Sequence, residues 1–536
     1  MTASFTLATI VREHVAKTPD APALTFEGAT LSFAELDERS SRAANALIGD
    51  GVRGGDRVAL LTRNTPEFYE IVFACSKIGA VLVGLNWRLA PPEIGAIVAD
   101  ATPSVIIVGP GEHGLLNADA RQSPGLRRVV TLGPEYEEWR AAGAALDPGA
   151  SGQADEVTLL LYTSGTTGVP KGVILTSAGM SYTLRVGAEI WGMSRTSVNL
   201  VVMPMFHIGG IQCGLSTMAQ GGHTVLMREV DTKAIIETIA AYGVTHSFFV
   251  PAVIQALLST PGVEAADLSS LQLLAYGASP IGDALLRRAI EVFGCSFMHV
   301  YGLTEASGAI AVLPPHDHDP GGDRSYLLRS CGRALPWVEL RVIDPGTHSD
   351  VEPGAVGEIW VSSGLVTKGY WNNPAATAEA ITPEGWLRTG DAAYQDDAGN
   401  VYLVDRFKDM IVSGGENVYP AEVENVLYDH PAIAEVAVIG VPHERWGETV
   451  KAIVVLRPGQ QVQTNELIEF ARTRLGKYKC PTSVEFTDVL PRNASGKVLK
   501  RELRQAYWQG TDRAINGLYG RPCKIPPARM SAHFPG

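Results

Sequence analysis

The chain has 536 residues, of which 46% are hydrophobic and 19% charged, and this composition excludes a disordered or fibrous protein. Asp and Glu outnumber Lys and Arg by 57 to 44, which argues against a protein that binds nucleic-acid phosphates. At this length we expect more than one domain, and we expect a small molecule rather than nucleic acid as the partner.

The cysteine pattern and the N-terminus both predict a cytoplasmic protein. The six cysteines are scattered without a C-x-x-C spacing, which indicates free thiols in a reducing compartment. Charged residues interrupt the first twenty positions, so no signal peptide is predicted. The most apolar stretch, residues 200–215, contains Pro204 and two glycines and cannot span a bilayer. Peripheral membrane contact through an apolar surface stays open, as does the choice between monomer and homodimer.

Short apolar runs divide the chain into regions. From Arg57 to Gly302 these runs alternate with segments of helical period, which predicts α/β sheets covered on both faces. Residues 331–404 favour hairpins in a small β subdomain, because Pro-Gly and Asp-Ala-Gly-Asn turns separate their apolar runs. After Asp405 the pattern is that of a compact α+β unit.

We therefore expect an α/β fold with two domains, residues 1–404 and 405–536. The first would hold α/β sheets and the β subdomain, and the second would be a small α+β domain. Residues 405–536 contain 18 Lys and Arg against 15 Asp and Glu, which leaves most of the negative charge in the first domain. A basic small domain is suited to supplying cations to a polyanionic cofactor.

The segment from Leu159 to Thr176 carries the clearest chemical signal. An apolar strand runs into a loop rich in glycine and hydroxyl side chains, which ends at Lys171. Glycines let backbone N–H groups approach a ligand, and hydroxyls and a lysine add donors and charge, a combination that suits phosphate. The lysine precedes Gly172, so the loop is not a Walker loop. A surface turn is the plain alternative, and the number of hydroxyls argues against it. The loop residues are Thr163, Ser164, Gly165, Thr166, Thr167 and Gly168.

Two further strands end in small and polar residues. One ends in Gly277, Ala278, Ser279 and Pro280, and the other in residues 301–305. Ligands bind beyond the carboxyl ends of strands in α/β sheets, so these ends predict one nucleotide pocket. Tyr301 can stack on a purine, Thr304 can donate to a phosphate and Glu305 can hold Mg²⁺. Individually, the tyrosine could equally belong to the core and the glutamate to the solvated surface.

Three later motifs complete a pattern. They are residues 386–391 (WLRTGD), 405–409 (DRFKD) with 413–417 (SGGEN), and 491–497 (PRNASGK). In this order, the motifs from Tyr162 to Leu503 resemble an acyl-CoA synthetase of the adenylate-forming superfamily, and the resemblance covers essentially the whole chain.

The resemblance implies a large N-terminal domain of two α/β sheets with a small β-barrel subdomain, and a small mobile C-terminal α+β domain. It also implies a role for each motif. The loop up to Lys171 would hold the β- and γ-phosphates of ATP. The adenine would be surrounded by residues 277–280, Tyr301 and Gly302. Thr304 would contact the α-phosphate, and Glu305 would contact Mg²⁺. Asp391 and Arg406 would bind the ribose, and Lys497 would bridge the carboxylate and the α-phosphate. Lys408 would be the hinge, within residues 405–409. Gly414 and Gly415 would line a channel for the thiol of coenzyme A.

The leading hypothesis is ATP-dependent ligation of a carboxylic acid to CoA. The alternatives are an acyl-AMP ligase that loads a carrier protein, an oxygenase of the luciferase type, and a binding protein that has lost catalysis. The last would be expected to lack Lys497 or Glu305, and both are present.

The acyl pocket is expected among residues 206–210, 247–254 and 276–278 and the residues after Glu305, with His207 as a gate and Gly277 in its wall. These segments are apolar apart from the histidine, and they offer no Lys or Arg for a second carboxylate. A medium- or long-chain fatty acid is therefore the first expectation and an aryl or alicyclic acid the second. A histidine packed between strand and helix is as plausible a role for His207 as a gate.

Overall fold

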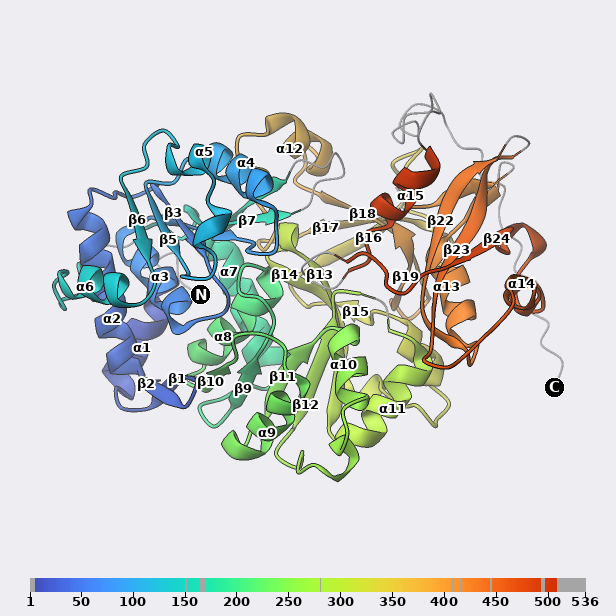
Figure 1. Ribbon diagram of the computed structural model, residues 1–536, viewed down its shortest axis with the longest axis horizontal. Helices are drawn as coiled ribbons and strands as arrows, with labels where there is room; N and C mark the ends of the chain where they lie inside the picture. The colour runs from blue at the N-terminus through green and yellow to red at the C-terminus, as the bar shows by residue number, and fades with distance from the viewer. Residues whose placement is uncertain are drawn as a thin grey trace.

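The computed structural model describes residues 5–149, 152–163, 170–279, 281–406, 409–413, 416–443, 446–492 and 497–508. The described residues form four sheets. The N-terminal elements lie at one end of the long axis and the C-terminal elements, drawn in orange and red, lie at the other (Figure 1). The architecture is the predicted one: α/β sheets in the larger part, a half-barrel sheet, and a small α+β part.

The first sheet has six strands, and its strands are parallel except for the last pair. Its central strands are buried along their whole length, as parallel strands covered on both faces must be. Helices α4 and α5 pack on one face, and α2, α3 and α6 pack on the other. In spatial order the strands are β6 (Arg128–Thr131), β5 (Val105–Val108), β3 (Arg57–Leu61), β4 (Val81–Leu85), β7 (Val157–Thr163) and β8 (Lys171–Thr176).

The second sheet has nine strands, parallel from β1 to β13 along its middle and antiparallel at both edges. Helices α9, α10 and α11 cover one face, and α7 and α8 cover the other (Figure 1). In spatial order the strands are β15 (Arg333–Ala334), β14 (Gly308–Leu313), β13 (Ser296–Leu303), β12 (Leu273–Gly277), β11 (His246–Phe249), β9 (Val198–Val201), β10 (His223–Leu226), β1 (Pro22–Phe26) and β2 (Ala29–Ser32).

Capping residues mark the ends of several helices. Ser32 caps α2 with a reciprocal capping box to Glu35, and Gly79 ends α3 in the left-handed region at φ 69°. The helices of the larger part are α1 (Ala8–Lys17), α2 (Phe33–Gly49), α3 (Pro66–Ile78), α4 (Pro91–Ala101), α5 (Ala118–Arg121), α6 (Pro134–Ala141), α7 (Ser177–Arg185), α8 (Ile208–Ala219), α9 (Thr232–Tyr242), α10 (Pro251–Leu258), α11 (Asp283–Phe293) and α12 (Pro374–Ala380).

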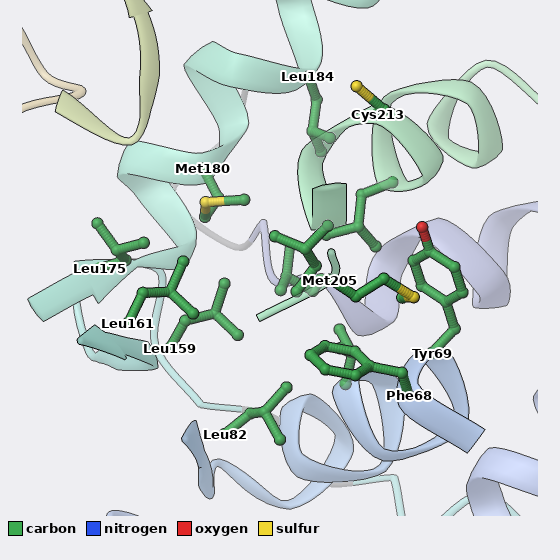
Figure 2. Packing of buried hydrophobic residues seen from close by; sticks show 14 of the residues in the cluster. Phe68, Tyr69, Leu82, Leu159, Leu161, Leu175, Met180, Leu184, Met205 and Cys213 are labelled. Atoms are coloured by element: carbon green, nitrogen blue, oxygen red, sulfur yellow. The ribbon is translucent and has the colours of Figure 1, made fainter. Parts of the chain in front are cut away.

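The main core joins the two large sheets. Side chains of β7, α3, α7 and α8 meet in it, among them Leu161, Phe68, Met180 and Cys213 (Figure 2). Because one continuous core fixes both sheets, their strand ends are held at fixed positions relative to each other.

The half-barrel is a four-stranded antiparallel sheet where the sequence favoured hairpins. Its strands are β16 (Glu339–Ile343), β17 (Gly357–Ser362), β18 (Leu387–Gln395) and β19 (Val401–Arg406). The C-terminal part has its own core and its own mixed sheet. Its elements are β20 (Ile411–Ser413), β21 (Glu416–Val418), α13 (Pro420–Tyr428), β22 (Ile433–His443), β23 (Gly447–Leu456), α14 (Thr464–Arg472), β24 (Ser483–Phe486) and α15 (Lys500–Trp508).

The five cysteines among the described residues are free thiols, as the spacing predicted. No helix in the described ranges has the length and apolar character needed to cross a membrane.

Candidate active site

The predicted phosphate loop connects two antiparallel strands. Thr163 ends β7 and Lys171 begins β8, and the two residues are register partners at the open end of this hairpin. A Cβ on Gly172 would lie 2.8 Å from Tyr162 Cζ, so any larger residue there would displace the Tyr162 ring. Residues Ser164 to Gly168 of the prediction lie outside the described ranges.

Thr304 and Glu305 follow β13 directly, in a short 3₁₀ turn (Thr304–Ala306). Tyr370 Oη donates a hydrogen bond to Glu305 Oε1 at 2.9 Å, and Lys171 Nζ lies 5.1 Å from the centre of the same tyrosine ring. The lysine of the phosphate hairpin and the predicted Mg²⁺ carboxylate are thus brought together across one side chain. Tyr370 was not among the residues that the sequence singled out.

The predicted adenine residues gather at the ends of β12 and β13. Gly277 is the register partner of Val300, and a Cβ on Gly277 would lie 2.1 Å from the Val300 carbonyl oxygen. Ala278 takes a left-handed conformation at φ 66°, unusual for a residue with a side chain. A Cβ on Gly302 would lie 2.0 Å from the Gly308 carbonyl oxygen. Ser279 follows Ala278 and is half-buried, whereas Pro280 lies outside the described ranges.

A hydrogen bond joins the second sheet to the half-barrel. Tyr301 Oη donates to Asp391 Oδ2 at 2.7 Å, and both side chains are 7% exposed. Burial and the charge of Asp391 raise the pKa of the Tyr301 hydroxyl, so it stays protonated and able to donate. The backbone of Asp391 is anchored by an N–H bond to Thr389 Oγ1, and Arg406 is its register partner on β19. The residues predicted for adenine and ribose therefore meet at one place.

His207 immediately precedes α8 and is its N-cap residue. Its pKa is lowered to about 4, first by burial and then by the charge of Arg88, so the ring is neutral at pH 7. Its Nε2 is buried without a hydrogen-bond partner among the described residues. The Phe206 ring lies 4.5 Å from the imidazole, and a Cβ on Gly209 would touch the Phe248 ring at 3.6 Å.

Arg88 is a residue that sequence reasoning missed at this point. It lies in the turn after β4, far in sequence from the segments expected to line the acyl pocket. Those segments indeed contain no Lys or Arg, but the fold brings a cation from elsewhere close enough to influence His207.

Two histidines that the sequence did not single out lie beside Tyr276, which was expected to line the acyl pocket. Tyr276 Oη and His318 Nε2 are 3.0 Å apart, and the His299 ring lies 4.9 Å from the Tyr276 ring. His299 is two residues before Tyr301 on β13, and its buried Nδ1 has no hydrogen-bond partner in the described part of the chain. Its position before the Tyr-Gly-x-Thr-Glu run was the signal that could have marked it.

The remaining predicted residues belong to the C-terminal part. Lys497 lies next to Val498, which forms an isolated bridge with Arg492, and Val498 packs against β22. Lys408, Gly414 and Gly415 lie outside the described ranges.

Comparison with known families gives two matches in chain order. The sequence model described as AMP-binding enzyme matches residues 11–371. The model described as AMP-binding enzyme C-terminal domain matches residues 422–497.

Curated proteins and solved structures match over nearly the whole chain. A feruloyl-CoA synthase from an Amycolatopsis species is 42% identical over 91% of this chain and 96% of its own length. The fatty acid acyl-carrier-protein ligase ScoC of Streptomyces coeruleorubidus is 39% identical over 95% of this chain and 98% of its own. The crystal structure of ATP-bound MatB from Rhodopseudomonas palustris superposes with a TM-score of 0.86 at 30% identity, covering 94% of this chain and 99% of that one.

Proposed function

Because the chain belongs to the AMP-binding enzyme family and is an adenylate-forming acid–thiol ligase, we propose that it joins an apolar carboxylic acid to coenzyme A in two steps. In the first step a carboxylate oxygen attacks the α-phosphorus of ATP, and the bond to the β-phosphate breaks. Pyrophosphate leaves and an acyl-adenylate remains. In the second step the CoA thiol loses its proton, attacks the acyl carbon and releases AMP.

The observation that carries this proposal is the hydrogen bond from Tyr301 to Asp391. A buried carboxylate held at the ends of β12 and β13 is suited to accept both hydroxyls of a ribose whose base lies against Tyr301. We propose the same ribose role for Arg406 and the adenine role for residues 277–279 and Gly302. The backbones of neighbouring strands lie too close to Gly277 and Gly302 for a Cβ at either position, and Gly302 is exposed, so its backbone is accessible to a ligand.

The phosphate end of the site suits ATP with Mg²⁺. The described residues contain no cluster of three or more His, Cys, Asp or Glu that could hold a metal alone. A single carboxylate that shares Mg²⁺ with substrate phosphates is the usual arrangement for nucleotides, so Glu305 fits that role. Bound Mg²⁺ would neutralise charge on the phosphates. We propose that Thr304 donates to the α-phosphate and that the residues from Thr163 to Lys171 hold the β- and γ-phosphates.

Lys497 would bring its charge to the carboxylate and the α-phosphate, where negative charge concentrates during attack. The thioester step needs a thiol in the same place. We propose that the part after residue 404 rotates about residues 405–409, with Lys408 at the hinge, so that Gly414 and Gly415 line the thiol channel.

The acid is expected to be apolar. Phe248, Ile208 and Val300 are half-buried side chains at the start of α8 and on the adjacent strands. A second carboxylate among them would lose several kcal/mol of solvation unless it were paired. A medium- or long-chain fatty acid is the first proposal. An aryl acid is the second, because the Phe248 ring packs against Gly209 and because a curated relative is a feruloyl-CoA synthase. The alternative acceptor is the pantetheine of a carrier protein, as the name of ScoC indicates for that relative.

The experiment is a pyrophosphate-release assay with ATP, Mg²⁺ and a panel of octanoate, palmitate, ferulate, malonate and phenylalanine, each with and without CoA. We expect an apolar acid to give the highest kcat/KM and CoA to accelerate turnover. A higher kcat/KM with malonate or phenylalanine would overturn the apolar assignment and direct attention to Arg88. CoA would be overturned as the acceptor if it did not accelerate pyrophosphate release and if the enzyme acylated a holo carrier protein instead.

A further inference from the structure

The segment Thr367–Trp371, called the crossing segment below, connects the first large sheet to the Mg²⁺ end of the candidate site. On one side it pairs with β8: the Ile174 N–H donates to the Gly369 carbonyl at 3.0 Å, and the Trp371 N–H donates to the Gly172 carbonyl at 2.7 Å. On the other side the Thr367 N–H donates to the Glu305 carbonyl at 2.8 Å. The crossing segment is therefore bonded both to the phosphate hairpin and to the turn that carries Glu305.

Tyr370 lies between the two. Its backbone is fixed by the bridge to Val173 and by a hydrogen bond from its N–H to Thr377 Oγ1 at 2.9 Å. Its hydroxyl donates to Glu305 Oε1, and its ring lies under the ammonium of Lys171. A half-buried side chain that is held at the backbone and touches both charged groups cannot move without moving them.

We propose that Tyr370 is a positioning residue that orients Glu305 for Mg²⁺ and Lys171 for the terminal phosphates, so that the two charges reach ATP with a fixed separation. The inference rests on the proposed roles of Glu305 and Lys171. The two contacts are chemically separate, because the hydroxyl acts on the carboxylate and the ring acts on the ammonium.

This separation makes the proposal testable with two variants. Tyr370→Phe keeps the ring and removes the hydroxyl bond to Glu305. Tyr370→Leu removes both. Tyr136→Phe is the matched control, because its hydroxyl also donates to a carboxylate, Glu70 Oε2, at 3.0 Å, but on α6 in the N-terminal part.

The first readout is metal binding without turnover. Each protein is saturated with α,β-methylene-ATP and titrated with Mn²⁺, and free Mn²⁺ is measured by electron paramagnetic resonance. Loss of a group that orients a metal ligand costs about 10- to 100-fold in metal affinity, so Tyr370→Phe should raise the Mn²⁺ dissociation constant by at least tenfold. Tyr136→Phe should leave it unchanged.

The second readout is nucleotide binding in EDTA, where no metal contributes. A lost cation–π contact corresponds to a factor of about 2 to 5, so Tyr370→Leu should bind the analogue that much more weakly and Tyr370→Phe as well as wild type. Thioester formation from a supplied acyl-adenylate uses neither Mg²⁺ nor pyrophosphate and should be unchanged in Tyr370→Phe.

Wild-type Mn²⁺ affinity in Tyr370→Phe would overturn the proposal, and so would an equal loss of adenylation and thioester formation in that variant, which would indicate a role in folding alone. If Tyr370→Leu fails to fold, the Mn²⁺ dissociation constant of Tyr370→Phe, compared with those of the wild type and Tyr136→Phe, still tests the proposal. Failure of the wild type to bind the metal–nucleotide complex would instead contradict the proposed function.

Discussion

Replacing Gly277 with alanine tests the geometry of the proposed nucleotide pocket. The added Cβ would lie 2.1 Å from the Val300 carbonyl oxygen, well inside the 3.0 Å that real Cβ contacts respect. The added Cβ would meet the backbone of β13, and a backbone cannot rotate away as a side chain could. The strand must therefore shift by most of an ångström, and Tyr301 is the next residue along it.

The expected cost follows from this displacement. Overpacking a well-packed site costs about 1–3 kcal/mol, and alanine returns about 0.4–1 kcal/mol by restricting the unfolded chain. We expect the free energy of unfolding to fall by about 1–2 kcal/mol. A shift of Tyr301 also displaces the Asp391 carboxylate that it holds, so the KM for ATP should rise on the order of tenfold, which corresponds to about 1.4 kcal/mol.

The assays are urea denaturation and ATP–pyrophosphate exchange, with Gly282→Ala as control. A Cβ on Gly282 meets nothing within 4 Å, so the alanine there causes no clash, and its expected cost is the loss of a favourable N-cap residue of α11, about 1 kcal/mol or less. Equal stability and equal KM for ATP in the two variants would refute the reasoning.

Three further variants test other parts of the site. His299→Gln probes the pH dependence of stability: burial, aided by His318, lowers the His299 pKa from 6.5 to about 4. Between pH 6.5 and pH 4 His299 is therefore protonated in the unfolded chain and neutral in the folded chain. Its contribution lowers the free energy of unfolding of the wild type by about 1.4 kcal/mol per pH unit as the pH drops through this range. Denaturation at pH 7 and pH 5 should show a smaller loss in the variant, and an equal loss contradicts the assignment. Tyr301→Phe removes one hydrogen-bond donor to the buried Asp391 and should lower the free energy of unfolding by about 1.5–3 kcal/mol and raise the KM for ATP, whereas unchanged values in denaturation and exchange assays would argue against the bond. Lys497→Ala should slow adenylation on the order of 10²-fold and spare thioester formation from a supplied acyl-adenylate, and an equal loss in both half-reactions would assign the lysine to the fold.

The sequence predicts the strand ends well because they combine two independent signals. The residues before Gly277 and before Gly302 are continuous apolar runs, and the residues after them are small or polar. An apolar run of that length must be buried, and the change in composition marks where it leaves the sheet. The ends of β12 and β13 could therefore be located from the sequence, whereas the nucleotide pocket at these ends stays a prediction.

Strand β18 shows where this reasoning fails. It contains the motif that ends in Asp391, but its residues do not alternate regularly, and Gly390 takes a φ of 72°. The strand also pairs with shifted register on both sides, so its period is broken near Asp391, the residue proposed to bind the ribose. The motif was recognisable, and the strand that presents it was not.

Tyr370 and Arg88 were missed for a different reason. Each acts on a group more than 60 residues away in sequence, on another element of the fold. A tyrosine in a turn or an arginine after a strand has no local pattern that marks a distant partner, and only the packed core that joins the sheets makes the pairing.

Isotope transfer from the carboxylic acid tests the central claim, that the acid attacks the α-phosphorus of ATP. The enzyme is incubated with ATP, Mg²⁺, CoA and either [¹⁸O₂]octanoate or [¹⁸O₂]ferulate, whichever turns over faster in the panel assay. Attack at the α-phosphorus leaves one carboxylate oxygen on the nucleotide after the thiol displaces it, so mass spectrometry should find one ¹⁸O in AMP and none in pyrophosphate. Label in inorganic phosphate with ADP as the nucleotide product would place the attack on the γ-phosphorus and contradict the account.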